Sequence, residues 1–409
     1  MPASRKTRGA RGFARCPRAV GRTRERPNTE PSPQMTSTAI LAGPRRGRGQ
    51  HAGARRPVRA RLPLALAALL PLLLAACGED HVHRYPQTTF HPTTEYARIT
   101  DWLFKYTMTL GAIVGLLVFA ILAYIMVRFR YRPGMAEPKQ VHGNTTVELI
   151  WTLVPALILA AIAVPTARAI FATQPEPPPN AVAIEVIGKQ WWWEFRYLIK
   201  DSRGAIVDTV VTANEIHVPQ GDTVHLLLKS DNVLHSFWVP QMGGKRDLIT
   251  NRVNHLVFMP EEPGVYLGQC AEFCGDSHAL MRMRLVVHTP QGYRDWLANE
   301  SRPAAEPVAG DSALLYGKQL VTAGQCAGCH YIEGTTAVGR TGPALTHFGR
   351  RLTMAGGILE NNAENLARWI ADAPSVKPGS KMPQLGGGIQ GGLTDEQIQY
   401  IVAYLQSLQ

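Results

Sequence analysis

Outside its first 76 residues, the chain lacks the excess of positive charge that its overall composition suggests. The 409 residues include 43 Lys and Arg against 31 Asp and Glu, a formal net charge of +12. Sixteen of the basic but only two of the acidic residues fall in residues 1–76, which leaves 27 basic and 29 acidic residues in the remainder. Because the remainder is slightly acidic, the sequence predicts no nucleic-acid partner.

Residues 1–76 also lack any regular apolar period and are rich in Arg, Pro and Gly, which is typical of a processed or disordered segment. They end in fifteen uncharged residues, 62–76, preceded by four arginines, the pattern of a signal peptide too short to span a bilayer. The sequence L-A-A-C, ending at Cys77, resembles a bacterial lipoprotein cleavage box and predicts a lipid anchor there. An ordinary signal peptide, or an uncleaved anchor with a chance cysteine, is the alternative. A leader of this length is also compatible with a start codon further downstream.

Two long uncharged runs follow a polar segment, 77–107, which we expect to form an exported tether. Residues 108–127 and 149–167 are each long enough to cross ~30 Å of hydrocarbon at ~1.5 Å per residue. They predict a two-helix transmembrane hairpin over 108–172. The connecting loop is the most basic part of this region, so the positive-inside bias places it in the cytoplasm and both termini on the outer face.

A β-rich domain is expected over 180–300, after a stiff proline linker at 175–179. Short strand-like segments separated by turn signals such as Gly221-Asp222 are typical of a sandwich or barrel. These segments lie at 181–187, 225–229, 256–259 and 281–287.

One stretch between two predicted strands, Cys270 to Met281, reads C-A-E-F-C-G-D-S-H-A-L-M. Thiolate and thioether ligands combined with imidazole favour copper, whereas zinc sites do not use methionine. A further histidine must come from elsewhere, and His235 in N-V-L-H-S-F-W-V-P is the best candidate. A buried pair of free cysteines beside a core methionine is the alternative. The candidate ligands within the stretch are Cys270, Cys274, His278 and Met281.

The spacing C-x-E-x-C-x3-H-x2-M, with V-L-H-S upstream, resembles the dinuclear copper centre of cytochrome c oxidase subunit II. The resemblance implies a cupredoxin-like fold in which Cys270 and Cys274 bridge two copper ions. It also implies that the carboxylate of Glu272 faces a magnesium ion at the contact with the catalytic subunit. The remaining copper ligands would be His235 and Met281 on one ion, and His278 and the backbone carbonyl of Glu272 on the other.

Two further segments resemble the same family. V-E-L-I-W-T-L-V-P implies that Glu148 lies where a proton pathway into the catalytic subunit begins; an ordinary interfacial charge is the alternative. K-Q-W-W-W-E-F-R-Y implies that Trp191, the first tryptophan, accepts the incoming electron. An aromatic face that packs on the hairpin or on another subunit is the alternative for this cluster. Asn232 departs from the family, which often has an acid there, so the sequence does not support docking of a free basic cytochrome at that position.

A Pro/Ala-rich linker, 301–309, precedes a domain expected to be all-α, 310–409. Its C-A-G-C-H sequence matches the c-type haem attachment signature, in which Cys326 and Cys329 bond to the porphyrin and His330 is the proximal iron ligand. A thioredoxin-like dithiol is the alternative, but the adjacent histidine and the absence of a βαβ pattern oppose it.

The sixth haem ligand should be a methionine or histidine on a loop well downstream. Met382, in K-P-G-S-K-M-P-Q-L, resembles the axial methionine of small class I cytochromes c, and Met354 is the second choice. Gly342-Pro343 resembles the loop whose proline carbonyl receives the other N–H of the proximal histidine. We expect helices over 311–322 and 362–371, and a last helix that opens with a capping box at Thr394.

The sequence therefore predicts a multidomain membrane protein with a transmembrane hairpin, an all-β cupredoxin-like barrel and an all-α cytochrome c domain. The resemblance implies subunit II of a proton-translocating cytochrome c oxidase that carries a dinuclear copper centre and one covalent haem c. Its electrons would come from a cytochrome c or a bc1-type donor and go to subunit I, which reduces dioxygen; subunit III and the lipid bilayer are further expected partners. The expected location is the bacterial inner membrane, with the copper and haem domains on the periplasmic face. The alternative is a membrane-anchored electron shuttle to another terminal reductase, such as a nitrous oxide reductase-like system.

Overall fold

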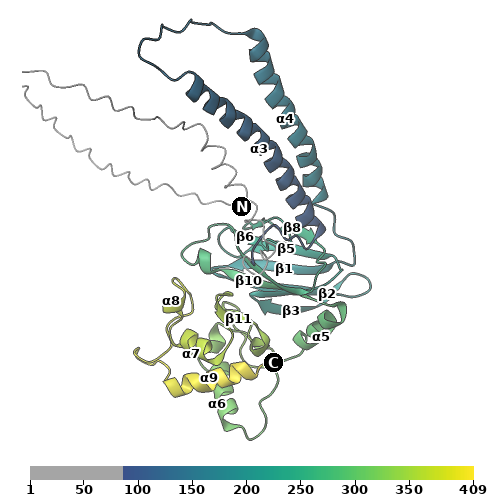
Figure 1. Ribbon diagram of the computed structural model, residues 1–409. Helices are drawn as coiled ribbons and strands as arrows, with labels where there is room; N and C mark the ends of the chain where they lie inside the picture. The colour runs from purple at the N-terminus through teal and green to yellow at the C-terminus, as the bar shows by residue number, and fades with distance from the viewer. Residues whose placement is uncertain (1–85) are drawn as a thin grey trace, which may run out of the picture. The chain divides into compact units, whose positions relative to one another are not determined.

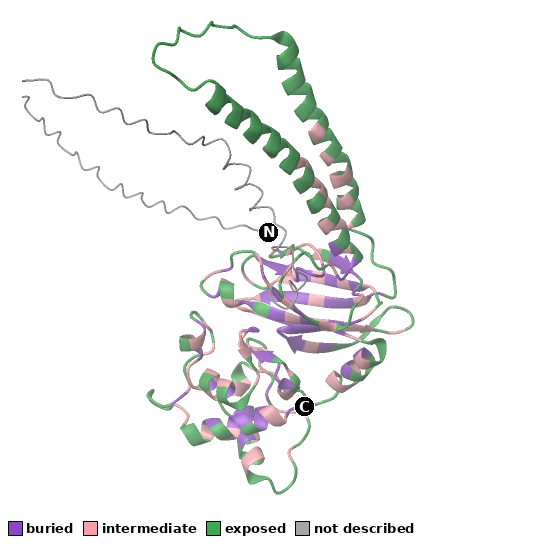
Figure 2. Ribbon diagram, in the orientation of Figure 1, coloured by how far each residue is buried: buried purple, intermediate pink, exposed green. Residues whose placement is uncertain are grey.

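The computed structural model describes residues 86–409 (Figure 1). The predicted leader and Cys77 lie outside the described residues. The described chain begins with two long helices, α3 (Glu95–Arg128) and α4 (Thr145–Ala172), both apolar and long enough to cross a membrane. Most of their residues are exposed (Figure 2), which is the arrangement expected when lipid, not a protein core, surrounds an apolar helix.

Helix α3 begins well before the apolar run that predicted it. The side chain of Thr94 caps the helix by accepting a hydrogen bond from the backbone N–H of Ala97 at 3.0 Å. Residues 95–107, which we expected to belong to the exported tether, are therefore helical. Helix α4 likewise starts at an N-cap, Asn144, ahead of its predicted apolar run.

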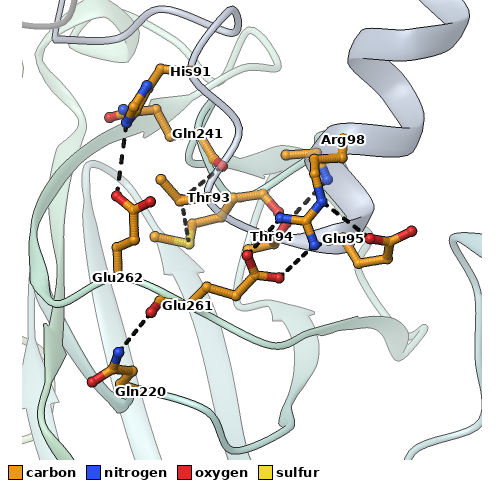
Figure 3. A network of polar contacts seen from close by, with 11 residues as sticks. His91, Thr93, Thr94, Glu95, Arg98, Gln220, Gln241, Glu261 and Glu262 are labelled. Carbon is orange, nitrogen blue, oxygen red and sulfur yellow. Dashed lines mark hydrogen bonds and ion pairs between the residues drawn. The ribbon is translucent and has the colours of Figure 1, made fainter.

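Hydrogen bonds and an ion pair connect the start of α3 to the β domain (Figure 3). Thr94 also donates its hydroxyl to the carbonyl oxygen of Met242 at 2.8 Å. The guanidinium of Arg98 donates to both carboxylate oxygens of Glu261, at 2.5 and 2.6 Å. These contacts join the hairpin to the β domain by side chains as well as by the linker.

The β domain consists of two five-stranded sheets with strand orders β3-β2-β1-β5-β8 and β4-β10-β9-β6-β7 (Figure 1). Within the sheets, β1 runs parallel to β5 and β4 parallel to β10. Fully buried side chains from both sheets, among them Phe195 and Phe237, form one core between them. This sandwich confirms the predicted cupredoxin-like class. The strands are β1 (Val182–Lys189), β2 (Trp192–Lys200), β3 (Ile206–Ala213), β4 (Glu215–Pro219), β5 (Val224–Ser230), β6 (His235–Trp238), β7 (Arg246–Leu248), β8 (Asn254–Phe258), β9 (Gly264–Cys270) and β10 (Arg282–His288).

Helix α5 (Pro290–Glu300) follows β10 and was not expected from the sequence. Its start carries a signal that would have located it, because Thr289 caps the helix and Pro290 occupies the first turn. Trp296 of α5 is buried and packs against Tyr197 of β2, with 5.0 Å between the ring centroids and 59° between the ring planes. The helix thus completes the core of the β domain.

The helical domain has its own core, built mainly by α6 (Ser312–Thr322), α7 (Ala363–Ala371) and α9 (Asp395–Ser407). Thr394 and Gln397 form the predicted capping box at the start of α9. Shorter elements complete this domain: η3 (Gln325–Gly328), η4 (Phe348–Arg350), β11 (Thr353–Met354), β12 (Leu359–Glu360) and α8 (Ala373–Val376).

Candidate functional site

The metal-binding loop connects the end of β9 to the start of β10. It is closed by a 2.9 Å hydrogen bond from the backbone N–H of Cys270 to the carbonyl oxygen of Met281. Strand β6 pairs with β9 so that Phe237 lies opposite Cys270, which brings His235 at the start of β6 beside the loop. Sheet pairing, not sequence proximity, therefore supplies the fifth predicted side chain.

The structure brings all the predicted copper ligands together. The sulfur atoms of Cys270 and Cys274 lie 3.7 Å apart, and Cys270 Sγ lies 3.8 Å from His235 Nδ1. On the other side, Cys274 Sγ lies 3.6 Å from His278 Nδ1 and 3.9 Å from Met281 Sδ.

These separations fit metal ligation. Two atoms that bind the same ion at about 2.3 Å, the length of a zinc–thiolate bond, must lie within about 4.6 Å of each other. Both thiols meet this condition with each other and each with one histidine, and Cys270 Sγ also lies 3.2 Å from the carbonyl oxygen of Glu272. The soft donor set, which includes a thioether, is that of a copper site.

The two thiols share one hydrogen bond, which couples their titration. The contact with Cys274 lowers the pKa of Cys270 below its ordinary value and raises that of Cys274. The pair therefore accepts one negative charge readily and resists a second one. A bound cation removes that resistance, because metal ligation deprotonates thiols.

The imidazole of His235 is oriented by a hydrogen bond on the side of the ring away from the thiols. Its Nε2 lies 3.1 Å from Oδ1 of Asn232, so Nε2 donates to Asn232 and Nδ1 is left to face the thiols. Gly188 permits this placement, since a Cβ there would lie 2.7 Å from the imidazole ring. The sequence marked Asn232 only as a departure from the family; the structure makes it the partner that orients a ligand.

Trp191 contacts the same loop. Its indole N–H donates to the carbonyl oxygen of Cys274 at 2.9 Å, and the Gln190 side chain donates to the same oxygen, also at 2.9 Å. Trp193, two residues on, is fully buried and packs edge-on against Phe237. The first and third tryptophans thus have different contacts: Trp193 belongs to the core, whereas Trp191 contacts the metal-binding loop.

A largely apolar cavity of about 300 Å³ lies in the helical domain and reaches Trp191. It is lined by the predicted haem residues Cys326, Cys329, His330 and Met382, and by Met354. Both candidate methionines therefore face one cavity. Met354 is only 3% exposed and belongs to strand β11, whereas Met382 lies half-buried on a loop.

The proximal histidine is oriented as the sequence predicts. The Nδ1–H of His330 donates to the carbonyl oxygen of Pro343 at 2.8 Å, which leaves Nε2 free to bind iron. Gly342 is required beside it, because a Cβ there would lie 2.8 Å from the ring. Burial lowers the pKa of His330, which keeps the ring neutral. The two thiols, the oriented imidazole and the apolar lining fit a c-type haem.

Two predicted carboxylates stand apart from these sites, although the backbone carbonyl of Glu272 lies beside Cys270 Sγ. The carboxylate of Glu148 accepts a 3.1 Å hydrogen bond from the backbone N–H of Asn144, so it helps to cap α4. Glu272 is exposed. The metal-ligand cluster found among residues 86–409 consists of His235, Cys270 and Cys274, and does not include Glu272.

Sequence reasoning also missed Lys377, which is buried in the helical domain. Its Nζ donates to the carbonyl oxygen of Trp191 at 2.6 Å and to that of Ala355 at 3.0 Å. Burial lowers the pKa of this lysine to about 7. A lysine in a loop resembles any solvated charge in a sequence, so no local signal reveals the contact.

Comparison with known proteins covers all three parts of the chain. The family model for the cytochrome c oxidase subunit II transmembrane domain matches residues 88–168, that for the subunit II periplasmic domain residues 182–289, and that for cytochrome c residues 314–409. The cytochrome c oxidase subunit 2 of Alkalihalophilus pseudofirmus is 37% identical over 85% of this chain and 96% of the relative. The corresponding proteins of a Bacillus species and of Bacillus subtilis are 36% and 31% identical, each over 84% of this chain and 96% and 97% of their own lengths.

The copper domain is thus periplasmic, on a membrane protein with two transmembrane helices, and subunit I of a haem-copper oxidase is its partner. The His/Cys/Cys cluster is a copper site of the kind found in these subunits, and the helical domain is a cytochrome c haem domain. The chain belongs to the cytochrome c oxidase subunit II family, in the form that carries a cytochrome c domain after the copper domain.

Proposed function

We propose that the chain takes up electrons at its own haem domain and passes them by way of Trp191 to a two-copper centre, from which they leave for subunit I. Electron transfer to subunit I follows from the family; the proposal concerns the residues and their order. One observation carries it: Trp191 is bonded to Cys274 of the copper loop and lines the same cavity as Cys326 and His330.

The residues of the chain hold, orient and shield the two centres. Cys270 and Cys274 lie between the two histidines and would bridge the copper pair, with His235 and Met281 on one ion and His278 and the Glu272 carbonyl on the other. Cys326 and Cys329 would anchor the porphyrin, and His330 and Met382 would ligate its iron. When bound, the haem and the copper pair supply the one-electron redox chemistry.

Met382 is the preferred axial ligand because Met354 is fixed by strand pairing and core packing. The backbone of Met354 is fixed in the hairpin of β11 and β12, and its side chain is buried in the core of the helical domain. Met382 lies on a loop, in a Pro- and Gly-rich stretch, and is free of such pairing. A Met382→Ala variant should lose the axial thioether, whereas Met354→Leu should keep it.

The external donor would be a cytochrome c or a bc1-type complex, and subunit III would join subunit I in the bacterial inner membrane. Glu272, exposed on the copper loop, would face a magnesium ion at the contact with subunit I. Glu148 would admit protons in addition to capping α4, and Cys77 would carry a lipid.

Metal and haem analysis of the full-length chain tests the proposal. We expect two copper ions and one covalent haem per chain, with a near-infrared mixed-valence band that bleaches on reduction. Cys274→Ser should abolish the band and retain the haem, whereas Cys326→Ser should disturb haem attachment and retain the band. A single copper or zinc ion without that band would contradict the two-copper centre.

A further inference from the structure

Glu215 opens strand β4 of the copper domain, but its carboxylate is bonded by the haem domain. Oε1 accepts the backbone N–H of Thr353 at 2.7 Å and the Thr353 hydroxyl at 2.9 Å, and Oε2 accepts the backbone N–H of Leu352 at 3.1 Å. The side chain is only 2% exposed. A carboxylate this deeply buried is unusual unless its partners are fixed.

The copper domain holds Glu215 rigidly. Asn214, directly before it, adopts a φ of 63°, in the left-handed region that asparagine tolerates better than most residues. The side chain of Asn214 accepts a hydrogen bond from the backbone N–H of Trp193. The backbone N–H of Asn214 donates to the Trp193 carbonyl oxygen, so Asn214 is bonded to β2 just beyond Trp191. The backbone of Glu215 lies opposite that of Arg284 where β4 pairs with β10. The carboxylate therefore projects from a strand end that is fixed on two sides.

The segment that is hydrogen-bonded to Glu215 is also linked to Trp191, by way of Lys377. After Thr353 the chain forms a turn in which the carbonyl oxygen of Gly356 accepts the backbone N–H of Arg282 at 2.8 Å. The carbonyl oxygen of Ala355 accepts from Lys377, which also donates to the carbonyl oxygen of Trp191. Residues 352–356, which we call the docking segment, thus contact the copper domain at both ends.

The bonding pattern suits positioning better than simple attraction. Among residues 86–409 the Glu215 carboxylate has no Lys or Arg ion pair, and the imidazole of His217 is 4.0 Å away. Burial raises the pKa of Glu215, and the bonds from Leu352 and Thr353, together with the nearby charge of Arg351, oppose that effect. Arg351 itself donates to the carbonyl oxygen of Ala344. Three directed N–H and O–H donors fix both distance and angle, whereas a lysine ammonium would tolerate many geometries.

We propose that Glu215 is a positioning residue that locks the docking segment onto the copper domain and so keeps the haem cavity against Trp191. The inference rests on the proposed route of electrons through Trp191. In this account the haem domain works from one docked position and does not search for the copper domain on its linker. In the docked state Lys377 of the haem domain also covers the Trp191 carbonyl.

The test uses the full-length chain in the assembled oxidase, with the variants Glu215→Ala, Glu215→Gln and Glu185→Gln. Glu185 is the matched control, a carboxylate on β1 whose partner, Lys229, belongs to the same domain. Deuterium exchange at the amides of Leu352 and Thr353 reports the lock directly, because those two N–H groups donate to Glu215. Visible and near-infrared spectra show whether haem and copper remain in place, and rapid reduction of the haem measures its transfer of electrons to copper.

In Glu215→Ala we expect the two amides to exchange roughly ten- to hundredfold faster, the effect of losing hydrogen bonds to a charged acceptor. The haem-to-copper step should lose its single rapid phase, while both spectra and the reduction of haem by its donor stay unchanged. In Glu215→Gln the exchange rate should lie between those of the wild type and Glu215→Ala, since the amide keeps one acceptor oxygen. The control Glu185→Gln should match the wild type. If Glu215→Ala does not fold, Thr353→Val removes the hydroxyl alone and should give a smaller acceleration at the same amides.

Unchanged exchange and unchanged transfer in the Glu215 variants would overturn the positioning role. That result is distinct from failure of the proposed function, which would show as no haem-to-copper transfer in the wild type.

Discussion

The indole N–H of Trp191 donates a 2.9 Å hydrogen bond to the carbonyl oxygen of Cys274, one of the two thiol residues of the copper loop. The bond places the tryptophan ring on the loop backbone, and the same ring borders the haem cavity. Gly379, on the loop that carries Met382, leaves room for this ring, since a Cβ there would lie 2.9 Å from it. Trp191 thus contacts both domains.

Replacing Trp191 by phenylalanine should separate its contact role from its effect on stability. A smaller aromatic ring replaces the indole and the hydrogen bond is lost, so we expect a cost of about 1 kcal/mol in stability and slower haem-to-copper transfer, with both spectra retained. Rapid-mixing kinetics at the haem and copper bands would measure this. Trp102→Phe is the control, because Trp102 is exposed on α3 and neither lines the haem cavity nor contacts Cys274. Equal transfer rates in the two variants would contradict the account.

Removing the partner of His235 should weaken copper binding without removing a ligand. In Asn232→Ala the Nε2–H of His235 loses its acceptor, and we expect copper affinity to fall by about 10- to 100-fold. Asn232→Asp should instead make the ligand more basic and lower the reduction potential of the copper centre. Copper titration and potentiometry measure the two effects. Asn254→Ala, which removes an exposed hydrogen bond to Asp247, should leave both unchanged.

The attachment of the hairpin to the copper domain should depend more on packing than on charge. Arg98 and Glu261 are partly exposed, so Glu261→Gln should cost less than about 1 kcal/mol. Gly243→Ala should cost about 1–3 kcal/mol, since φ is 142° and a Cβ would lie 2.9 Å from the Tyr96 ring.

Thermal unfolding in detergent compares these variants. Gly204→Ala is a suitable control, because it shares the positive φ but has nothing within 4 Å of the added Cβ. A larger loss in Glu261→Gln than in Gly243→Ala would reverse the order that the structure requires.

The stability of the copper domain should fall in mild acid because of His217. Burial first, and then His288 and Arg351, lower the pKa of His217 from 6.5 to about 3. The unfolded chain therefore binds a proton below pH 6.5 that the folded chain refuses, so stability is complete above that pH and is lost as the pH falls toward 3.

The variant His217→Phe keeps the stacking on Trp296 but cannot titrate. Between pH 7 and pH 5 it should lose about 2 kcal/mol less stability than the wild type, whatever its stability at pH 7. Urea unfolding at the two pH values gives the difference. His142→Gln, at an exposed position between α3 and α4, should behave as the wild type does. An identical loss in His217→Phe and the wild type would exclude His217 as the cause.

The parts of the site that could be predicted are those in which the chemistry is local in the sequence. The copper loop holds four candidate ligands within twelve residues, and C-A-G-C-H places three haem contacts within five. The structure adds the distances that let them act together, such as the 3.7 Å between Cys270 Sγ and Cys274 Sγ.

The parts that could not be predicted depend on pairings between distant segments. Glu215 and Thr353 are 138 residues apart, and Trp191 and Lys377 are 186 apart. A buried carboxylate or lysine has the same letter in the sequence as a solvated one, so only the fold reveals its partner. The early start of α3 was missed for a different reason: the apolar run marks what crosses the membrane, whereas the Thr94 cap determines where the helix begins.

The most direct test of the account follows one electron within the full-length chain. The haem is reduced in a rapid-mixing or flash experiment, and its reoxidation is compared with bleaching of the copper band at several protein concentrations. If the haem cavity and the copper loop meet at Trp191 within one chain, the two signals change together with a first-order rate that does not depend on protein concentration. A rate that rises in proportion to concentration, or copper that is reduced while the haem stays reduced, would contradict it.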